Sequence, residues 1–131
     1  MGLYGINIMD EPKIIKLGNI INEEAGLVVA QNDSTIPFEI RRVYWFYKVP
    51  EGQERGHHAH KKNQKILVCN RGTVEVTLEN PSGKKFDFVL DKPFEGLFVP
   101  ALYWGTFRFK GDASMICLAS ELYSEEDYIR S

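Results

Sequence analysis

The sequence predicts an all-β domain, either a β-sandwich or a small barrel, from three observations. Short apolar or alternating segments recur along the chain, and turn residues separate them about every 8–12 residues. No helical pattern stands between these segments, which argues against a doubly wound parallel sheet. The chain has 131 residues and shows no linker or internal repeat, so residues 1–131 are expected to form one domain around one core.

The first expected strands lie at residues 26–29 and 41–49, which are rich in β-branched and aromatic side chains. The clearest pattern follows at 73–79, where apolar and polar residues alternate strictly and the apolar side chains therefore share one face. The apolar run at 65–69 precedes it, and Asn-Arg-Gly at 70–72 is a turn signal between the two. We therefore predict that these two segments form a β-hairpin.

The rest of the chain repeats this organisation. Turn residues divide it into four further strands, at 84–90, 96–99, 103–109 and 113–119. Lys-Gly-Asp at 110–112 is interpreted as the turn between the last two of these strands. Only the tail at 124–130 has helical character, because Ser124 suits an N-cap and acidic residues fill the first turn. A short C-terminal helix is therefore expected.

Composition and charge exclude several classes of protein. Sixteen Lys and Arg against eighteen Asp and Glu give a net charge of -2, which offers no basic field for nucleic acid and no polybasic patch for a membrane. No apolar run approaches the ~20 residues needed to cross a bilayer, and no secretory signal pattern is seen. Cys69 and Cys117 lie in apolar runs and are expected to be buried, reduced thiols. These features favour a soluble cytoplasmic protein.

The three histidines of the chain, His57, His58 and His60, fall within four residues. If the backbone is extended at 58–60, strand alternation places His58 and His60 on one face and Ala59 on the other. His57 should then face away from the pair. Three interpretations are open: a polar loop with solvated histidines, a metal site, or metal-free acid–base chemistry by two groups that titrate near neutral pH.

The metal interpretation is poorly supported by the other residues. Two histidines in an H-x-H pattern usually need at least a third ligand from His, Cys or a carboxylate. No histidine occurs outside the cluster, and the next residue at a plausible spacing is Gln64, a weak neutral ligand. No metal and no other cofactor is therefore expected.

The spacing around the histidines resembles the first cupin motif. Gly52 is followed by His58-Ala-His60, then Gln64 and Gly72, and residues 96–105 are similar to the second cupin motif. Gln64 stands where metal-binding cupins carry Glu, and the 96–105 segment has Gly where they carry their last His. The resemblance implies a jelly-roll, double-stranded β-helix barrel that works without a metal.

A narrower resemblance extends over residues 14–130. Its most specific segments are I-P-F-E-I-R-R-V-Y at 36–44, R-G-H-H-A-H-K-K at 55–62 and D-Y-I-R at 127–130. Together they resemble the dTDP-4-keto-6-deoxyglucose 3,4-ketoisomerase family of WxcM-like cupins. This resemblance implies an isomerase that moves a keto group from C4 to C3 of a dTDP-linked deoxy sugar, in a pathway that supplies amino sugars to glycans. It also implies a homodimer, with N-terminal strands that can be exchanged between subunits.

The resemblance further implies which residues act. His58 and His60 match the catalytic pair, with His58 as the leading candidate for proton transfer at carbon and His60 as its partner. The diphosphate requires cations, for which Arg42 and Arg55 are the best candidates. Tyr44 and Trp104 are expected to stack on thymine or to line the sugar pocket, and Trp45 is a further aromatic candidate.

Other functions remain open from the sequence. A dTDP-sugar 3,5-epimerase would abstract protons at C3 and C5 and keep the carbonyl at C4. A non-enzymatic cupin would only bind the nucleotide sugar. A metal dioxygenase would need more metal ligands than the sequence offers. Glu24-Ala25, Gln31 and Gly105 depart from the residues typical of the ketoisomerases. These departures leave the C4 configuration of the product open between galacto and gluco.

Overall fold

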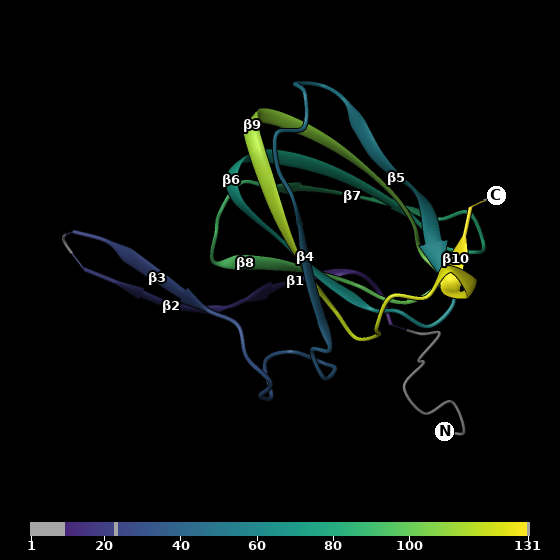
Figure 1. Cartoon of the computed structure of the whole chain (residues 1–131), viewed down its shortest axis with the longest axis horizontal. Coiled ribbons are helices and arrows are strands. Elements are labelled where there is room, and N and C mark those ends of the chain that lie inside the picture. Colours follow the sequence, from purple (N-terminus) through teal and green to yellow (C-terminus); the bar gives the residue numbers. More distant parts are fainter. Residues whose placement is uncertain (1–9, 23, 131) are drawn as a thin grey trace.

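The computed structural model describes residues 10–22 and 24–130, and strands make up most of this part of the chain (Figure 1). The strands are β1 (Lys13–Lys16), β2 (Gly18–Ile21), β3 (Gly26–Val29), β4 (Arg42–Phe46), β5 (Glu54–His60), β6 (Lys65–Glu79), β7 (Lys85–Leu90), β8 (Glu95–Val99), β9 (Trp104–Ala119) and β10 (Tyr128–Ile129). A single 3-10 turn, η1 (Glu125–Asp127), precedes β10. The all-β prediction is confirmed.

Two sheets share the long strands β6 and β9, which pair antiparallel from Lys65 opposite Ala119 to Glu79 opposite Trp104. The first half of β6 and the second half of β9 belong to a sheet with the order β1-β8-β6-β9-β4. Their other halves belong to a sheet with the order β7-β6-β9-β5-β10. The two sheets face each other across a common interior, which is the jelly-roll arrangement that the cupin resemblance implies.

The hairpin predicted over 65–79 is wrong, and so is the turn predicted at 110–112. Each of these segments lies within one continuous strand, and the pairing of β6 with β9 shifts register between Cys69 and Thr73. Gly72 has a φ of 73°, and a Cβ added to it would lie 2.7 Å from the carbonyl oxygens of Lys110 and Gly111. The turn residues therefore let two paired strands bend together from one sheet into the other, rather than reverse.

The C-terminal helix is also absent from the described residues. Ser124 makes no side-chain capping hydrogen bond, and after η1 the chain extends and pairs with β5, Tyr128 opposite His60 and Ile129 opposite Ala59. The carboxylate of Asp127 accepts hydrogen bonds from the main-chain N–H groups of the loop after β5. This tertiary pairing outweighs the local helical signals.

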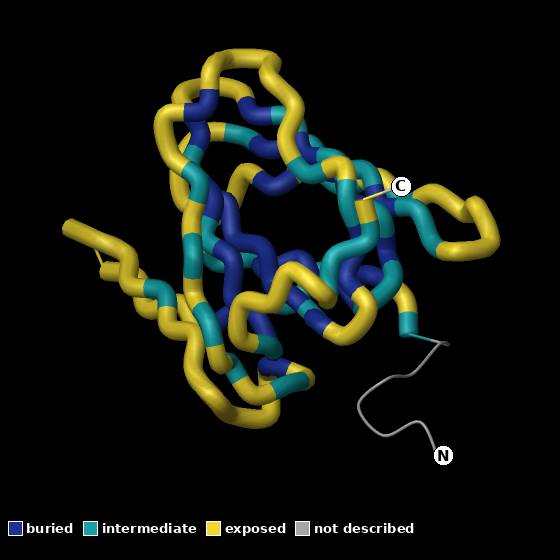
Figure 2. The backbone as a smooth tube through the Cα atoms, turned by 45° about the vertical axis from the view of Figure 1, so that its right-hand side comes forward, coloured by how far each residue is buried: buried dark blue, intermediate teal, exposed yellow. Residues whose placement is uncertain are grey.

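The interior is apolar at one end and polar at the other. Near the bend, buried side chains such as Phe109, Met115 and Leu90 fill the space between the sheets. Away from the bend, inward positions are taken by polar residues, including the buried His60 and Lys65. Figure 2 shows buried segments lining the space between the sheets and exposed segments around it. The candidate site is therefore the polar end of the interior.

The hairpin of β2 and β3 lies apart from both sheets and projects from the body (Figure 1). It exposes four large apolar side chains: Ile20 at 62%, Ile21 at 69%, Leu27 at 59% and Val29 at 37%. In the described part of the chain, no helix has the length and apolar character required to span a membrane.

Candidate active site

The two histidines at the end of β5 face each other inside the polar end of the interior. The ring centroids of His58 and His60 lie 4.9 Å apart with the ring planes at 89°. Strand alternation predicts that His58 and His60 share one face, and the structure confirms this. The pairing of β5 with β9 is irregular between Gly56 and His58, but residues 58–60 follow this irregularity and alternate regularly. His57 is exposed, with its Nε2 atom 3.4 Å from Glu54 Oε1, and faces away from the pair as expected.

A carboxylate fixes the orientation of His60. The Nδ1 atom of His60 lies 3.1 Å from Oδ2 of Asp127, so the neutral ring carries its proton on Nδ1 and donates it to the carboxylate. The Nε2 atom of His60 is buried and has no hydrogen-bond partner among the described residues. This free lone pair is the feature that a proton acceptor requires.

The orientation of His58 depends on the main chain of its own strand. Its Nδ1 atom lies 3.1 Å from the carbonyl oxygen of Gly56, so that Nδ1–H donates and Nε2 is left as the acceptor. Gly56 has a φ of 99°, and a Cβ there would lie only 2.5 Å from the carbonyl oxygen of Gly105. Glycine is therefore required at position 56 to bring this carbonyl under the imidazole.

The ring of Tyr128 closes the pair on one side. Its centroid lies 4.5 Å from that of His60 and 5.0 Å from that of His58. The guanidinium of Arg130 lies 4.4 Å from the centre of the same ring. The D-Y-I-R segment contributes to the family resemblance, but nothing local in the sequence indicates that Asp127 and Tyr128 contact the histidines, since the contact spans 67 residues.

Arg42 and Tyr44 lie on the opposite sheet and face the same interior. On β4 the residues at 42, 44 and 46 are the less exposed ones, whereas Val43 and Trp45 are exposed. The guanidinium of Arg42 lies 5.1 Å from the centre of the Tyr44 ring, and its Nε is buried without a partner among the described residues. Trp45, with 62% of its surface exposed, is on the outer face and does not reach the site.

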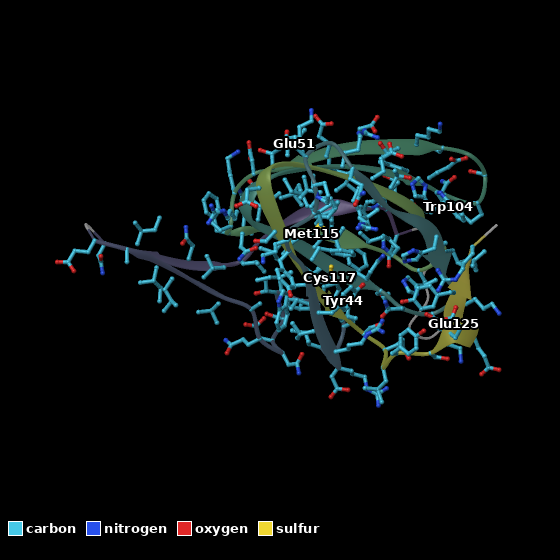
Figure 3. All side chains as sticks on the ribbon, turned by 45° about the horizontal axis from the view of Figure 1, so that its top comes forward. Tyr44, Glu51, Trp104, Met115, Cys117 and Glu125 are labelled. Atoms are coloured by element: carbon cyan, nitrogen blue, oxygen red, sulfur yellow. The ribbon has the colours of Figure 1, made fainter. Side chains whose placement is uncertain are left out.

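Tyr44 lies directly opposite Cys117 on β9, and Figure 3 shows both side chains within the molecule. Burial raises the pKa of the Tyr44 phenol, and it raises the pKa of the Cys117 thiol to about 12. Both groups are therefore neutral near pH 7, and Cys117 is the buried reduced thiol that the sequence predicts.

Lys65, the first residue of β6, is a site residue that sequence reasoning missed. Its side chain is in the interior with only 4% of the residue exposed, and Nζ lies 5.5 Å from the centre of the Phe107 ring. Burial lowers the pKa of its ammonium to about 8. The run at 65–69 has no alternation that would indicate which face Lys65 occupies, so the sequence carries little signal for it.

The surroundings keep both imidazoles in their basic, neutral form. Burial, and next the ammonium of Lys65, lower the pKa of His58 to about 4. The same two causes, in the same order, lower the pKa of His60 to about 3 despite the neighbouring carboxylate. At neutral pH the site therefore holds two uncharged bases beside a cation.

Arg55 and Trp104 are not packed against the histidine pair. Arg55 is exposed and lies opposite Phe107, whose ring faces the interior, so it occupies an inward register position between the histidines and the bend. Trp104 lies opposite Glu79 and alternates with the buried Gly105, which places it on the outer face of β9 (Figure 3). Trp104 therefore does not face the histidine pair, and its expected contact with thymine or the sugar stays a prediction.

The described residues include no cluster of three or more His, Cys, Asp or Glu side chains arranged to hold a metal ion. What they bring together are two neutral imidazoles, a tyrosine against them, and two cations on the facing sheet. Such an arrangement can move a proton on a bound molecule and can stabilise negative charge that develops on it.

Comparisons with known proteins identify relatives of this chain. The family described as "FdtA: WxcM-like, C-terminal" matches residues 10–131. The TDP-4-oxo-6-deoxy-alpha-D-glucose-3,4-oxoisomerase of Aneurinibacillus thermoaerophilus is 39% identical over 121 residues, which cover 92% of this chain and 86% of that protein.

Solved structures give the same result. A histidine-to-asparagine mutant of the 3,4-ketoisomerase QdtA from Thermoanaerobacterium thermosaccharolyticum, in complex with TDP-4-keto-6-deoxyglucose, superposes with a TM-score of 0.86 at 34% identity, covering 92% of this chain and 87% of that chain. The TDP-quinovose 3,4-ketoisomerase WlaRB from Campylobacter jejuni has a TM-score of 0.86 at 30% identity, covering 94% and 95%. The chain therefore belongs to the FdtA family of WxcM-like proteins.

Proposed function

We propose that the protein is a sugar 3,4-ketoisomerase that converts dTDP-4-keto-6-deoxyglucose into a dTDP-3-keto-6-deoxyhexose. The observation that carries the proposal is the His58–His60 pair, two neutral imidazoles 4.9 Å apart in a buried interior. The A. thermoaerophilus relative acts on this class of substrate by name, and it is 39% identical over 92% of this chain. The protein is thus an intramolecular oxidoreductase of the isomerase class.

The reaction requires only proton transfers. The C3–H bond is acidified by the adjacent C4 carbonyl, and His58 removes this proton, so that the electron pair forms a C3–C4 double bond and negative charge develops on the C4 oxygen. The hydroxyl proton on the C3 oxygen passes to the C4 oxygen, and His60 is the group assigned to carry it. A proton is then delivered to C4, and the C3 ketone forms. Atoms and electrons balance without an external oxidant or reductant.

The pKa values of the two imidazoles support these roles. A general base must be unprotonated at the working pH, and both pKa values lie well below 7. The hydrogen bond from His60 to Asp127 holds the free Nε2 atom toward the interior, where it can accept a proton. No metal is required by this scheme, so added chelator should leave turnover unchanged.

Substrate binding is assigned to residues around the pair. Arg42, whose buried Nε has no partner among the described residues, and the exposed Arg55 are the proposed ligands of the diphosphate. Tyr44, beneath the guanidinium of Arg42, is proposed to line the sugar pocket. Trp104 does not enter this proposal because it lies on the outer face of β9.

The proposal includes a homodimer. The hairpin of β2 and β3 exposes Ile20, Ile21 and Leu27 away from its own sheets, and an apolar hairpin of this kind is stabilised when it packs on a second copy. Light scattering after gel filtration should give twice the mass of the chain, and Ile21→Asp should shift the protein toward the monomer. A monomeric mass for the unaltered chain would contradict the dimer.

One experiment tests the proposed function. The protein is incubated with dTDP-4-keto-6-deoxyglucose in deuterated water, and the sugar is followed by NMR. Isomerase action predicts a ketone at C3 and solvent deuterium at C4. A parallel incubation in ordinary water keeps a proton at C4, and the coupling of this proton to H5 reports the galacto or gluco configuration. Deuterium at C3 and C5 with the ketone still at C4 would indicate a 3,5-epimerase. No exchange would indicate a module that only binds the nucleotide sugar.

A further inference from the structure

Lys65 is a buried cation without a counter-charge. Only 4% of the residue is exposed. Arg42 is its neighbour in the sheet, since both residues pair with Ala119 of β9. Among the described residues, neither of the two forms an ion pair with a carboxylate. Burial of an unpaired ammonium costs free energy of folding. The aromatic face of Phe107 at 5.5 Å offsets part of this cost, but a ring is a weaker partner than an anion. The position is therefore suited to an anion that arrives with the substrate.

The groups around Lys65 are neutral or positive near pH 7. The titratable and charged groups that face it are Arg42 and Tyr44 from β4, His58 and His60 from β5, and Cys117 from β9, with Tyr128 and Arg130 behind the histidines. The side chains of β8, the other neighbour of β6, are apolar at this level. The one carboxylate in this part of the described chain is Asp127, which lies behind His60 and is hydrogen-bonded to it, so the cations Arg42 and Lys65 have no anion beside them.

A nucleotide sugar substrate has two negatively charged parts with which Lys65 could pair. One is the diphosphate, and the other is the sugar oxygen that becomes charged during proton transfer. Lys65 is as deeply buried as His60, whereas Arg55 is exposed. The ammonium also acts on both imidazoles, since after burial it is the largest influence on each. Its place is therefore beside the reacting carbon atoms rather than with the diphosphate.

We propose that Lys65 is a further catalytic residue, whose ammonium stabilises the enediolate oxygen as the C3 proton leaves. This inference depends on the proposed function. When the C3–H bond breaks, its electron pair forms the C3–C4 double bond, and the carbonyl π electrons move onto the C4 oxygen. The ammonium keeps its proton and donates a hydrogen bond to this oxygen. In a dry interior such a donor contributes far more than in water.

The test compares Lys65→Met and Lys65→Gln with a matched control, Lys85→Met, which removes an exposed lysine at the start of β7. Removal of one donor to a developing oxyanion lowers kcat by about 10²–10³-fold. Both Lys65 variants should show this loss and should bind TDP within about threefold of the unaltered protein. The control should keep both values. The Gln variant retains a polar group, so it provides a second folded protein if the Met variant is unstable.

The pH profile separates a chemical role from a structural one. If the charged ammonium is needed, kcat/KM of the unaltered protein should fall as the pH rises through about 8, and the variants should lack this alkaline decrease. An unchanged kcat in both Lys65 variants would overturn the proposal, and so would a loss of TDP affinity as large as the loss of kcat, which would make Lys65 a phosphate ligand. If the unaltered protein does not isomerise the sugar, the proposed function itself fails; if it does and the variants match it, only the role of Lys65 fails.

Discussion

The Nδ1 atom of His60 lies 3.1 Å from Oδ2 of Asp127, although 67 residues separate them in the chain. The same carboxylate accepts hydrogen bonds from the main-chain N–H groups of Lys62 and Asn63. Asp127 therefore fixes the loop that follows β5 and, through one oxygen, the tautomer of a proposed catalytic histidine. Its charge also favours the imidazolium that His60 becomes for a moment when it carries a proton.

Asp127→Asn should lower kcat by at least about tenfold, because an amide can turn its NH₂ toward Nδ1 and favour the wrong tautomer of His60. KM should change little, since Asp127 does not face the proposed substrate. Steady-state kinetics would check this, with Asp91→Asn, an exposed carboxylate after β7, as the control. Equal kcat values for the two variants would argue against a positioning role for Asp127.

His58→Asn and His60→Asn should each abolish measurable turnover while TDP still binds, because the proposed diphosphate ligands are elsewhere. His57→Asn should remain active, since His57 is exposed and its ring lies beside Glu54 and faces away from the pair. Turnover by NMR and TDP binding by calorimetry give the two measurements. Normal turnover in either of the first two variants would remove that histidine from the mechanism.

Activity should persist to unusually low pH for histidine chemistry. Burial and Lys65 lower the pKa of His58 to about 4. At pH 6.5, where an ordinary histidine is half protonated, His58 therefore remains unprotonated and can act as a base. The value of kcat/KM should therefore change little from pH 7.5 to 6 and should fall only as the pH approaches 4. A half-maximal value close to pH 6.5 would show that the base has an ordinary pKa.

Stability should depend on pH through His60. Its folded pKa is about 3 against 6.5 in the unfolded chain, so between these values the unfolded state binds a proton that the folded state does not. The stabilisation is complete above pH 6.5 and is lost as the pH falls, by about 1.4 kcal/mol per pH unit for one such group. Urea unfolding gives the free energy of unfolding at pH 7 and at pH 5. Its decrease between these two values should be about 2 kcal/mol larger for the unaltered protein than for His60→Gln. Equal losses would contradict this assignment.

Strand alternation was enough to predict which histidines meet. The structure also shows Arg42 and Tyr44 turned inward on the same face of β4, as two residues at alternate positions of a strand must be. Such predictions succeed because the direction of a side chain on a strand depends only on its immediate neighbours. The same reasoning applied to Trp104 would have turned it outward, since Gly105 and Phe107 are the inward residues of β9.

The remaining features depend on contacts that are distant in sequence. Asn-Arg-Gly at 70–72 has the composition of a reversing turn, and only the pairing of β6 with β9 makes it a bend. Lys65 begins a short apolar run, and a lysine is usually expected at the surface, so neither periodicity nor composition indicates that it is buried. The partner of His60 is at the other end of the chain and follows from the pairing of β10 with β5.

The sharing of β6 and β9 between the two sheets also limits how the site can work. The imidazoles are on one sheet and the cations on the other, yet the same two uninterrupted backbones pass through both. Because β5 and β4 both pair with β9, the proposed base and the Arg42 cation are held by one continuous strand and not by separate lobes. For the proposed reaction we therefore expect the base and the cations to be in position before any sugar binds.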